Sequence, residues 1–241
     1  MRMCVHGKKA KTVTNMILSV CLLLLNSCVT YYPQAVDIPL IKEKGDARLD
    51  AGMFLIPALN TVNESDSNII ADMGINATFT SGITDILAVQ AFLSFDVLSR
   101  IHIQGALGVY KAFENKTVME LYGGFGYGNS IWSSAYNESR DDYLLTFAQY
   151  NLGQTGLGKS NIDFGMGLKG GYLQNNSVTD DFYKKNGWMM EPSVFFRFGS
   201  NRAKYNVKVI YLWTDTVAEK YYFPLSVSMG VNFHVGRRTQ K

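Results

Sequence analysis

The chain holds few residues of the types that perform nucleophilic or metal chemistry. It has three histidines and three cysteines, and only His102, His234 and Cys28 follow residue 27. A structural zinc site needs about four nitrogen or sulfur ligands, so we predict no metal site. Asp141 and Asp142 are paired acids that a histidine could join in hydrolysis, but both histidines fall elsewhere on the strands predicted below. The sequence therefore predicts a protein that is not an enzyme.

A second motif with chemical potential is the segment 165–170, which reads GMGLKG and matches the pattern GxGxxG. A dinucleotide site of this type needs a strand before the motif and a helix after it. Alternating apolar and polar residues continue on both sides here, so the motif lies within a strand. We therefore predict no bound cofactor.

The clearest chemical signal is at Cys28. Residues 1–15 carry four cations and no acid, and an apolar run follows at 16–25. These are features of a secretory signal, and the run is shorter than the roughly 20 residues that a membrane-spanning helix needs. The sequence LNSC ending at Cys28 resembles a bacterial lipobox, in which the cysteine is acylated and becomes the first mature residue. We predict a lipoprotein signal peptide over 1–27 and a lipid such as palmitate on Cys28; the alternative is a signal anchor with an incidental cysteine.

Removal of residues 1–27 changes the charge of the protein. The whole chain is +3, and the signal contributes four cations and no acid, so the mature chain carries −1. Nucleic-acid-binding domains are typically strongly basic, so we predict no nucleic-acid partner. Residues 29–44 hold two prolines and little alternation, which predicts a lipidated N-terminal tether over 28–44. A basic tail is predicted at 237–241.

Between residues 45 and 236 apolar and polar residues alternate, which marks strands with two unlike faces. One face is nearly free of charge, and the other carries charges, amides and many glycines. The alternating segments are 47–57, 69–80, 86–96, 101–112, 117–130, 143–151, 161–174, 188–199, 204–213 and 223–235. We predict an all-β fold, an antiparallel up-and-down β-barrel of about ten strands, with eight as the alternative count.

Alternation alone cannot separate a soluble barrel from a transmembrane one, because the latter turns its apolar face outward. Three features favour the membrane. Glycines on the polar face suit a narrow interior, and most segments are long enough for tilted strands that cross a bilayer. Trp132, Trp188 and Trp213 fall at one rim of the predicted barrel, as in an interfacial aromatic girdle. The rival fold is a soluble, tethered, lipocalin-like barrel.

The last predicted strand contains SMGVNFHV at 228–235, which resembles the C-terminal assembly signal of bacterial outer-membrane barrels. With the lipobox at Cys28, the segment TYYPQA at 30–35 and YGGFGYG at 122–128, the chain resembles lipid-anchored outer-membrane β-barrel proteins of Bacteroidota type. The resemblance implies the bacterial outer membrane, with its lipid and envelope proteins as partners, and it implies no active site. Both termini are then expected in the periplasm. The lipid is expected in the inner leaflet of the outer membrane, because Val29 is not the aspartate of lipoproteins kept at the inner membrane and no acidic cluster of a surface-exported lipoprotein follows it.

Charges on the polar face nearly balance. We predict that nine of them project into the barrel lumen and pair there: Arg48, Asp50, Asp72, Glu120, Asp163, Lys169, Glu191, Arg197 and Lys208. Unpaired buried charge costs several kcal/mol, whereas a selective pore more often shows one dominant sign. The leading prediction is a structural or accessory component of an envelope assembly. A small passive channel is the alternative, followed by a membrane-embedded hydrolase.

Overall fold

The computed structural model describes residues 37–63, 66–96, 100–134, 137–158, 161–175, 186–215 and 225–235. Only the backbone is described at residues 57–63, 66–72, 100, 130–134, 137–141 and 175. The predicted signal peptide, Cys28 and the predicted basic tail at 237–241 lie outside the described residues. Within the described part of the chain, no helix is long and apolar enough to cross a membrane.

The described chain is built from strands. They are β1 (Ala47–Asn63), β2 (Asp66–Gly82), β3 (Leu87–Asp96), β4 (Arg100–Ala112), β5 (Thr117–Ser134), β6 (Asn137–Leu157), β7 (Ile162–Asn175), β8 (Asn186–Gly199), β9 (Ala203–Tyr211), β10 (Trp213–Thr214) and β11 (Leu225–His234). The short β10 continues β9 beyond Leu212, because both pair with β8 in one register, Ile210 opposite Ser193 and Trp213 opposite Met190. The structure therefore has ten strands in effect.

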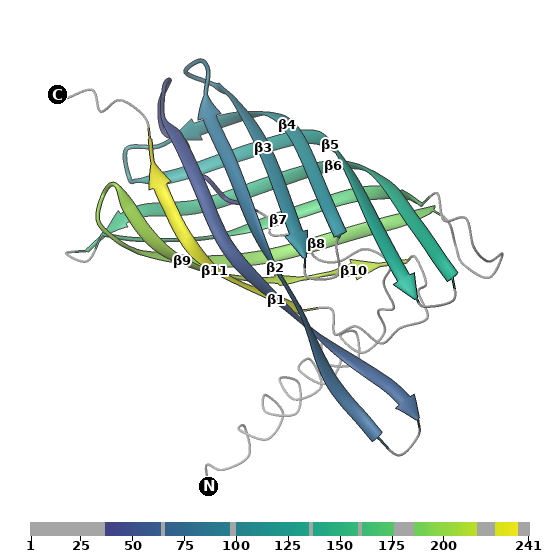
Figure 1. Cartoon of the computed structure of the whole chain (residues 1–241). Coiled ribbons are helices and arrows are strands. Elements are labelled where there is room, and N and C mark those ends of the chain that lie inside the picture. Colours follow the sequence, from purple (N-terminus) through teal and green to yellow (C-terminus); the bar gives the residue numbers. More distant parts are fainter. Residues whose placement is uncertain are drawn as a thin grey trace, which may run out of the picture.

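The sheet closes on itself. Each strand pairs antiparallel with the next along the chain, and β9 pairs with both β8 and β11. The seam joins β1 to β11, from Arg48 opposite His234 to Leu55 opposite Val227. The predicted fold, a closed antiparallel up-and-down β-barrel of ten strands, is thus confirmed (Figure 1).

The two ends of the barrel differ in their connections. At the end where β1 begins, which we call the turn end, the strands are joined by residues 83–86, 113–116, 158–161 and 200–202. At the opposite end, the loop end, the connections are 64–65, 97–99, 135–136, 176–185 and 215–224. β11 also finishes at the turn end, where the Val235 amide donates to the Ala47 carbonyl at 2.8 Å.

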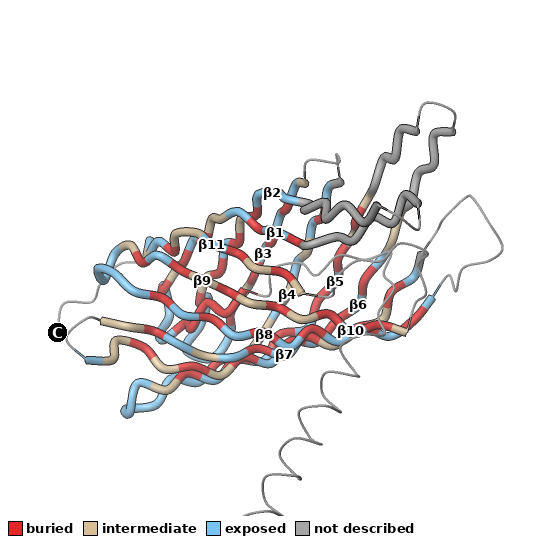
Figure 2. Tube along the Cα trace, turned by 90° about the horizontal axis from the view of Figure 1, so that it is seen from below, coloured by how far each residue is buried: buried red, intermediate tan, exposed pale blue. Residues whose placement is uncertain are grey.

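Buried and exposed residues alternate along the strands (Figure 2). The outward side chains are apolar and exposed, for example Leu107 at 66% and Phe125 at 72%. The inward side chains include many charges and amides, among them Arg197 and Glu191, both at 0%. A soluble barrel would bury the first set and expose the second, so this polarity is that of a barrel surrounded by lipid.

Aromatic side chains gather near both rims. At the loop end, Trp188 and Trp213 are exposed, and Trp188 makes an edge contact with Tyr172 at 5.2 Å between ring centroids. At the turn end, Phe198 lies 5.7 Å from Tyr205, and both rings are exposed. Such rings occupy the two membrane–water interfaces of transmembrane barrels.

One strand is much longer than its sequence pattern predicts. The alternation predicts a strand over 143–151, but β6 runs from Asn137 to Leu157. Its C-terminal part stays paired with β7, although the register shifts between Gln154 and Leu157. Residues 137–142 are all polar and residues 153–156 include no large apolar side chain, so apolar and polar types do not alternate there although the strand pairing continues.

The inverted polarity predicts a large cost for an outward charge. Met53 is 62% exposed, and its cross-strand neighbours Ile75 and Met229 are also apolar and exposed. Replacing Met53 by Arg should lower the free energy of unfolding by about 2–4 kcal/mol if this position lies near the bilayer centre. Reversible urea unfolding in phospholipid vesicles measures the effect.

The control for this experiment is Met53→Leu, which conserves volume and should cost less than about 1.5 kcal/mol. A Met53→Arg protein as stable as this control would contradict a lipid-facing exterior. So would a chain lacking residues 1–28 that stays monomeric and folded in buffer without detergent.

Candidate functional site

The first described residues, Asp37 to Ile41, lie inside the barrel rather than outside it. All five are buried, and Ile38, Leu40 and Ile41 are fully inaccessible. We call this stretch the interior segment. Residues 37–41 are therefore not part of a solvated tether, in contrast to the prediction for 28–44. Burial of their apolar side chains lowers the free energy of the folded protein, and the Asp37 carboxylate pairs with cations of the wall.

The barrel wall is shaped to receive the interior segment. Ile38 and Leu40 pack with Phe92, Val118, Phe195 and Ile210 from four different strands. Glycines leave the necessary room, since a Cβ added at Gly153 would lie 2.9 Å from a methyl carbon of Leu40. One added at Gly167 would lie 2.9 Å from Cδ1 of Ile38. These inward glycines thus let the segment approach the wall closely.

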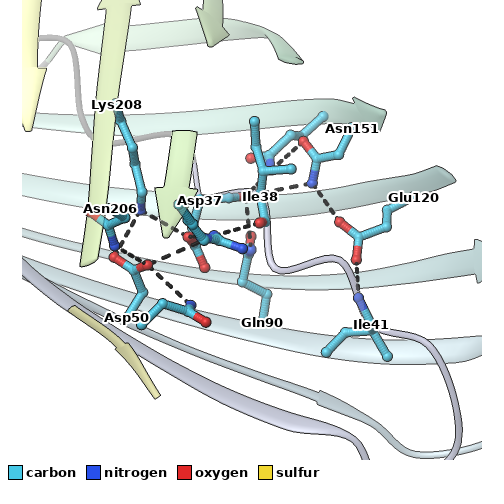
Figure 3. Close-up of polar contacts among 12 residues, drawn as sticks. Asp37, Ile38, Ile41, Asp50, Gln90, Glu120, Asn151, Asn206 and Lys208 are labelled. Atoms are coloured by element: carbon cyan, nitrogen blue, oxygen red, sulfur yellow. Dashed lines mark hydrogen bonds and ion pairs between the residues drawn. The ribbon is translucent and has the colours of Figure 1, made fainter. Parts of the chain in front are cut away.

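Asp37 belongs to a cluster of four buried charges (Figure 3). Lys208 Nζ lies 2.9 Å from Asp37 Oδ1 and 2.8 Å from Asp50 Oδ1. Arg197 Nη2 lies 3.5 Å from Asp37 Oδ1 and 3.8 Å from Asp50 Oδ2. Two carboxylates face two cations, so the cluster is neutral as a set, although each member alone would be costly to bury.

Two amide side chains also donate hydrogen bonds to the Asp50 carboxylate. Asn206 Nδ2 donates to Asp50 Oδ2 at 2.6 Å, and Asn232 Nδ2 donates to the same oxygen at 3.1 Å. The Arg197 guanidinium also covers the Phe195 ring at 4.6 Å from its centroid. Hydrogen bonds and a cation–π contact thus supplement the ion pairs, as a buried charge cluster requires.

The backbone of the interior segment is also bound by the wall. Glu120 accepts a hydrogen bond from the Ile41 amide at 2.7 Å and another from Asn151 Nδ2 at 2.9 Å. Arg197 Nη2 donates to the Ile38 carbonyl at 2.6 Å, and Gln149 Nε2 donates to the Asp37 carbonyl at 2.7 Å (Figure 3). Side chains of the wall therefore satisfy three backbone groups of a segment that has no strand partner, the Ile41 amide and the Asp37 and Ile38 carbonyls.

A second polar group lies further along β7 and β8, toward the loop end. Lys169 Nζ is 3.6 Å from Glu191 Oε2 and donates to Gln104 Oε1 at 2.7 Å. His102 forms hydrogen bonds with Tyr143, at 2.7 Å between Nδ1 and the hydroxyl, and with Gln104. His102 is buried in these contacts.

Beyond this group the interior becomes apolar. Leu145, Phe147, Leu173, Met189 and Leu212 form a buried cluster, with Ala106 and Tyr143 packed against it. Leu173 and Met189 stand near the loop-end limits of β7 and β8. Among the described side chains, the interior is therefore layered, with the apolar cluster nearest the loop end.

At the turn end, acidic and basic side chains pair around the mouth of the barrel. Asp46 Oδ1 lies 3.8 Å from Arg48 Nε and 3.1 Å from His234 Nε2. Lys204 Nζ lies 2.6 Å from Asp163 Oδ1. The contacts of Asp46 hold the start of β1 against the end of β11, and the Lys204–Asp163 pair joins the starts of β9 and β7.

The structure brings most of the predicted lumen charges together. Arg48, Asp50, Glu120, Asp163, Lys169, Glu191, Arg197 and Lys208 are all buried in the interior, whereas the Asp72 side chain lies outside the described part. Sequence reasoning missed Asp37, Asp46 and Lys204. The available signal for Asp37 was its position in the otherwise apolar run 36–41, which suits burial better than a solvated tether.

No cluster of residues suited to a metal ion occurs in the part of the chain that the structure describes. The inward charges and the apolar exterior instead give a closed barrel of inverted polarity. This is the fold of an outer-membrane β-barrel.

Comparison with known proteins adds neighbours in fold. No family model and no curated protein matches the chain. The outer membrane protein OprG from Pseudomonas aeruginosa is similar at 13% identity and a TM-score of 0.40, over 83% of this chain and 100% of that chain. The translocator domain of the autotransporter NalP from Neisseria meningitidis is similar at 9% identity and a TM-score of 0.40, over 93% and 95%.

The charge cluster predicts strong coupling between Asp37 and Lys208. Asp37→Asn leaves Lys208 and Arg197 to share Asp50, so the free energy of unfolding should fall by about 3 kcal/mol. In a Lys208→Met background the same change should cost much less, because one of the two cations is already absent. Urea unfolding of the four proteins in vesicles gives the coupling energy.

The matched control is Glu114→Gln, which neutralises an exposed carboxylate in the turn 113–116. It should change stability by less than about 0.5 kcal/mol. Equal costs of Asp37→Asn in both backgrounds would show that the carboxylate and Lys208 do not interact in the folded protein.

Proposed function

We propose that this protein is a sealed, non-enzymatic barrel of the bacterial outer membrane that serves as a structural or accessory component of an envelope assembly. The burial of the interior segment within its own barrel supports this proposal most directly. Asp37 is ion-paired to two strands, and Ile38 and Ile41 are hydrogen-bonded to the wall through their backbone. The lumen is thus occupied by fixed protein groups rather than left for a solute.

The charges of the interior support the same proposal. A selective pore presents rings of one sign to the passing ion, whereas Lys208 and Lys169 here face carboxylates. An apolar layer around Leu145 and Leu173 then follows toward the loop end. Ions would have to displace paired charges and cross apolar surface, so a passive channel is the less favoured alternative.

Other functions have less support. A membrane-embedded hydrolase would need a catalytic histidine, and His102 is instead buried against Tyr143 and Gln104. A soluble lipocalin-like barrel would need a polar exterior, and outward residues such as Leu107 and Phe125 are apolar. These observations favour a protein that acts through its surface and its position in the membrane.

If the lumen is sealed, the protein should carry no steady ionic current across a planar lipid bilayer. Wild type should show no steady conductance, because the interior segment and the apolar layer are successive barriers on the path. Deletion of residues 37–41 removes one barrier and leaves every strand intact, so thermal motion of the apolar layer alone should open the path more often than in wild type. Single-channel recordings at 1 M KCl make this comparison.

Glu114→Gln, outside the interior, provides the control and should be as silent as wild type. Large, ion-selective conductance in wild type would overturn the sealed-barrel proposal and favour the channel. If the deletion variant inserts and folds but stays silent, the apolar layer alone closes the barrel, and the segment is not the seal.

We further propose that the protein is a lipoprotein anchored through Cys28, with both termini in the periplasm. Asp37 lies nine positions after Cys28, with eight residues between them. This stretch spans at most about 30 Å when fully extended, so the lipid would stay within one membrane thickness of the barrel interior. Stable anchoring requires more than one acyl chain, and lipoprotein-type modification supplies several.

Cys28→Ala should abolish acylation while the barrel still inserts, because the strands carry their own apolar surface. Metabolic labelling with an alkyne analogue of palmitate, followed by isolation of the protein from membranes, tests this expectation. Cys21→Ala, within the proposed signal, is the control and should label like wild type. Undiminished label in Cys28→Ala would disprove the anchor.

A further inference from the structure

The turn end of the barrel contains a cavity that the sealed-barrel function does not use. Its volume is about 210 Å³. Four cationic side chains and one carboxylate line it: Lys42, Arg48, Arg202, Lys204 and Asp163. This excess of positive charge contrasts with the neutral clusters deeper in the interior.

The one lining carboxylate is already engaged. Asp163 Oδ1 lies 2.6 Å from Lys204 Nζ and accepts a hydrogen bond from the Gly156 amide at 2.7 Å. Lys204 also donates to Asn161. Lys204 and Asp163 therefore neutralise each other and leave Lys42, Arg48 and Arg202 to determine the charge of the cavity.

Arg48 is a buried cationic residue in the wall of this cavity. It is only 6% exposed, and its Nε has no hydrogen-bond acceptor among the described residues. Its nearest carboxylate oxygen, Asp46 Oδ1, is 3.8 Å from Nε and is shared with His234. A buried guanidinium donor without an acceptor is costly, and an oxyanion in the cavity would satisfy it.

Lys42 and Arg202 add mobile donors at the rim of the cavity. Both residues are exposed, and neither the Lys42 ammonium nor the Arg202 guanidinium forms a hydrogen bond or ion pair within the part of the chain that the structure describes. Guanidinium groups bind phosphate through paired N–H donors. Two guanidiniums and one ammonium around a small cavity are the donors that a phosphate group requires.

We propose that this cavity binds a phosphate group, carried either by a soluble compound or by a lipid headgroup. The cavity volume of about 210 Å³ is many times the roughly 10–15 Å³ that one water needs, so a phosphate group, which is the size of a few waters, can enter. The site is independent of whether the lumen conducts, because it lies at the mouth beside the turns 158–161 and 200–202. Failure of the sealed-barrel proposal would therefore leave this one standing.

Calorimetric titration of the full chain in zwitterionic detergent with inorganic phosphate tests the proposal. Lys42→Gln and Arg202→Gln should each weaken binding by about tenfold, as expected for loss of one charge-assisted hydrogen bond. Lys44→Gln is the matched control, because Lys44 is exposed two residues away and does not line the cavity. It removes the same charge and should change the affinity by less than about twofold.

A second titration distinguishes the two sources of phosphate. Dioctanoyl phosphatidic acid in the same micelles should bind more tightly than inorganic phosphate if the natural ligand is a lipid headgroup, and no more tightly if it is soluble. In both cases Lys42→Gln should weaken binding. Absence of saturable binding to either probe, or equal losses in Lys42→Gln and Lys44→Gln, would overturn the proposal.

Discussion

Lys208 lies between two carboxylates, those of Asp37 and Asp50, inside the barrel. The outer surface of the barrel is apolar, so a charged side chain there would have no contact with water. An apolar exterior leaves the inward face as the only place for the ionisable residues of each strand. A narrow interior in turn leaves no room for a separate hydration shell around each charge. A charge deep in the interior therefore needs a protein partner, and the strands alone place Arg197 and Lys208 beside one carboxylate, Asp50. Asp37 supplies the second.

This constraint explains why the segment before β1 lies in the interior. Its carboxylate balances the charge, its apolar side chains fill space between strands, and Glu120 and Arg197 bind its backbone. Inward glycines such as Gly153 and Gly167 provide the room. The wall and the segment are thus complementary in charge, volume and hydrogen bonding, so protein groups fill this part of the interior.

Much of this fold could be predicted from alternation, because a period of two reports which face of a strand each residue occupies. Arg48, Lys169 and Arg197 could be placed inside for that reason. Asp37 could not, because residues 37–41 form no strand and Pro39 interrupts any local pattern. Its position depends on partners more than 150 residues away, Arg197 and Lys208. Strand ends such as those of β6 were also missed, since pairing continues through residues 137–142 and 153–154, which carry no large apolar side chains to alternate.

The seam between β1 and β11 has a consequence for how the protein assembles. It joins residues near the two ends of the described chain, Arg48 and His234. The β1–β11 pairing therefore has the largest sequence separation in the sheet, and its formation should be slow. Only residues 42–46 separate Asp37 to Ile41 from β1, and a charged segment would not readily enter a barrel that is already closed and filled. The segment must therefore remain with the open sheet until β11 arrives. Closure then traps it, and its escape is limited by the rate at which the seam opens rather than by the strength of its own contacts.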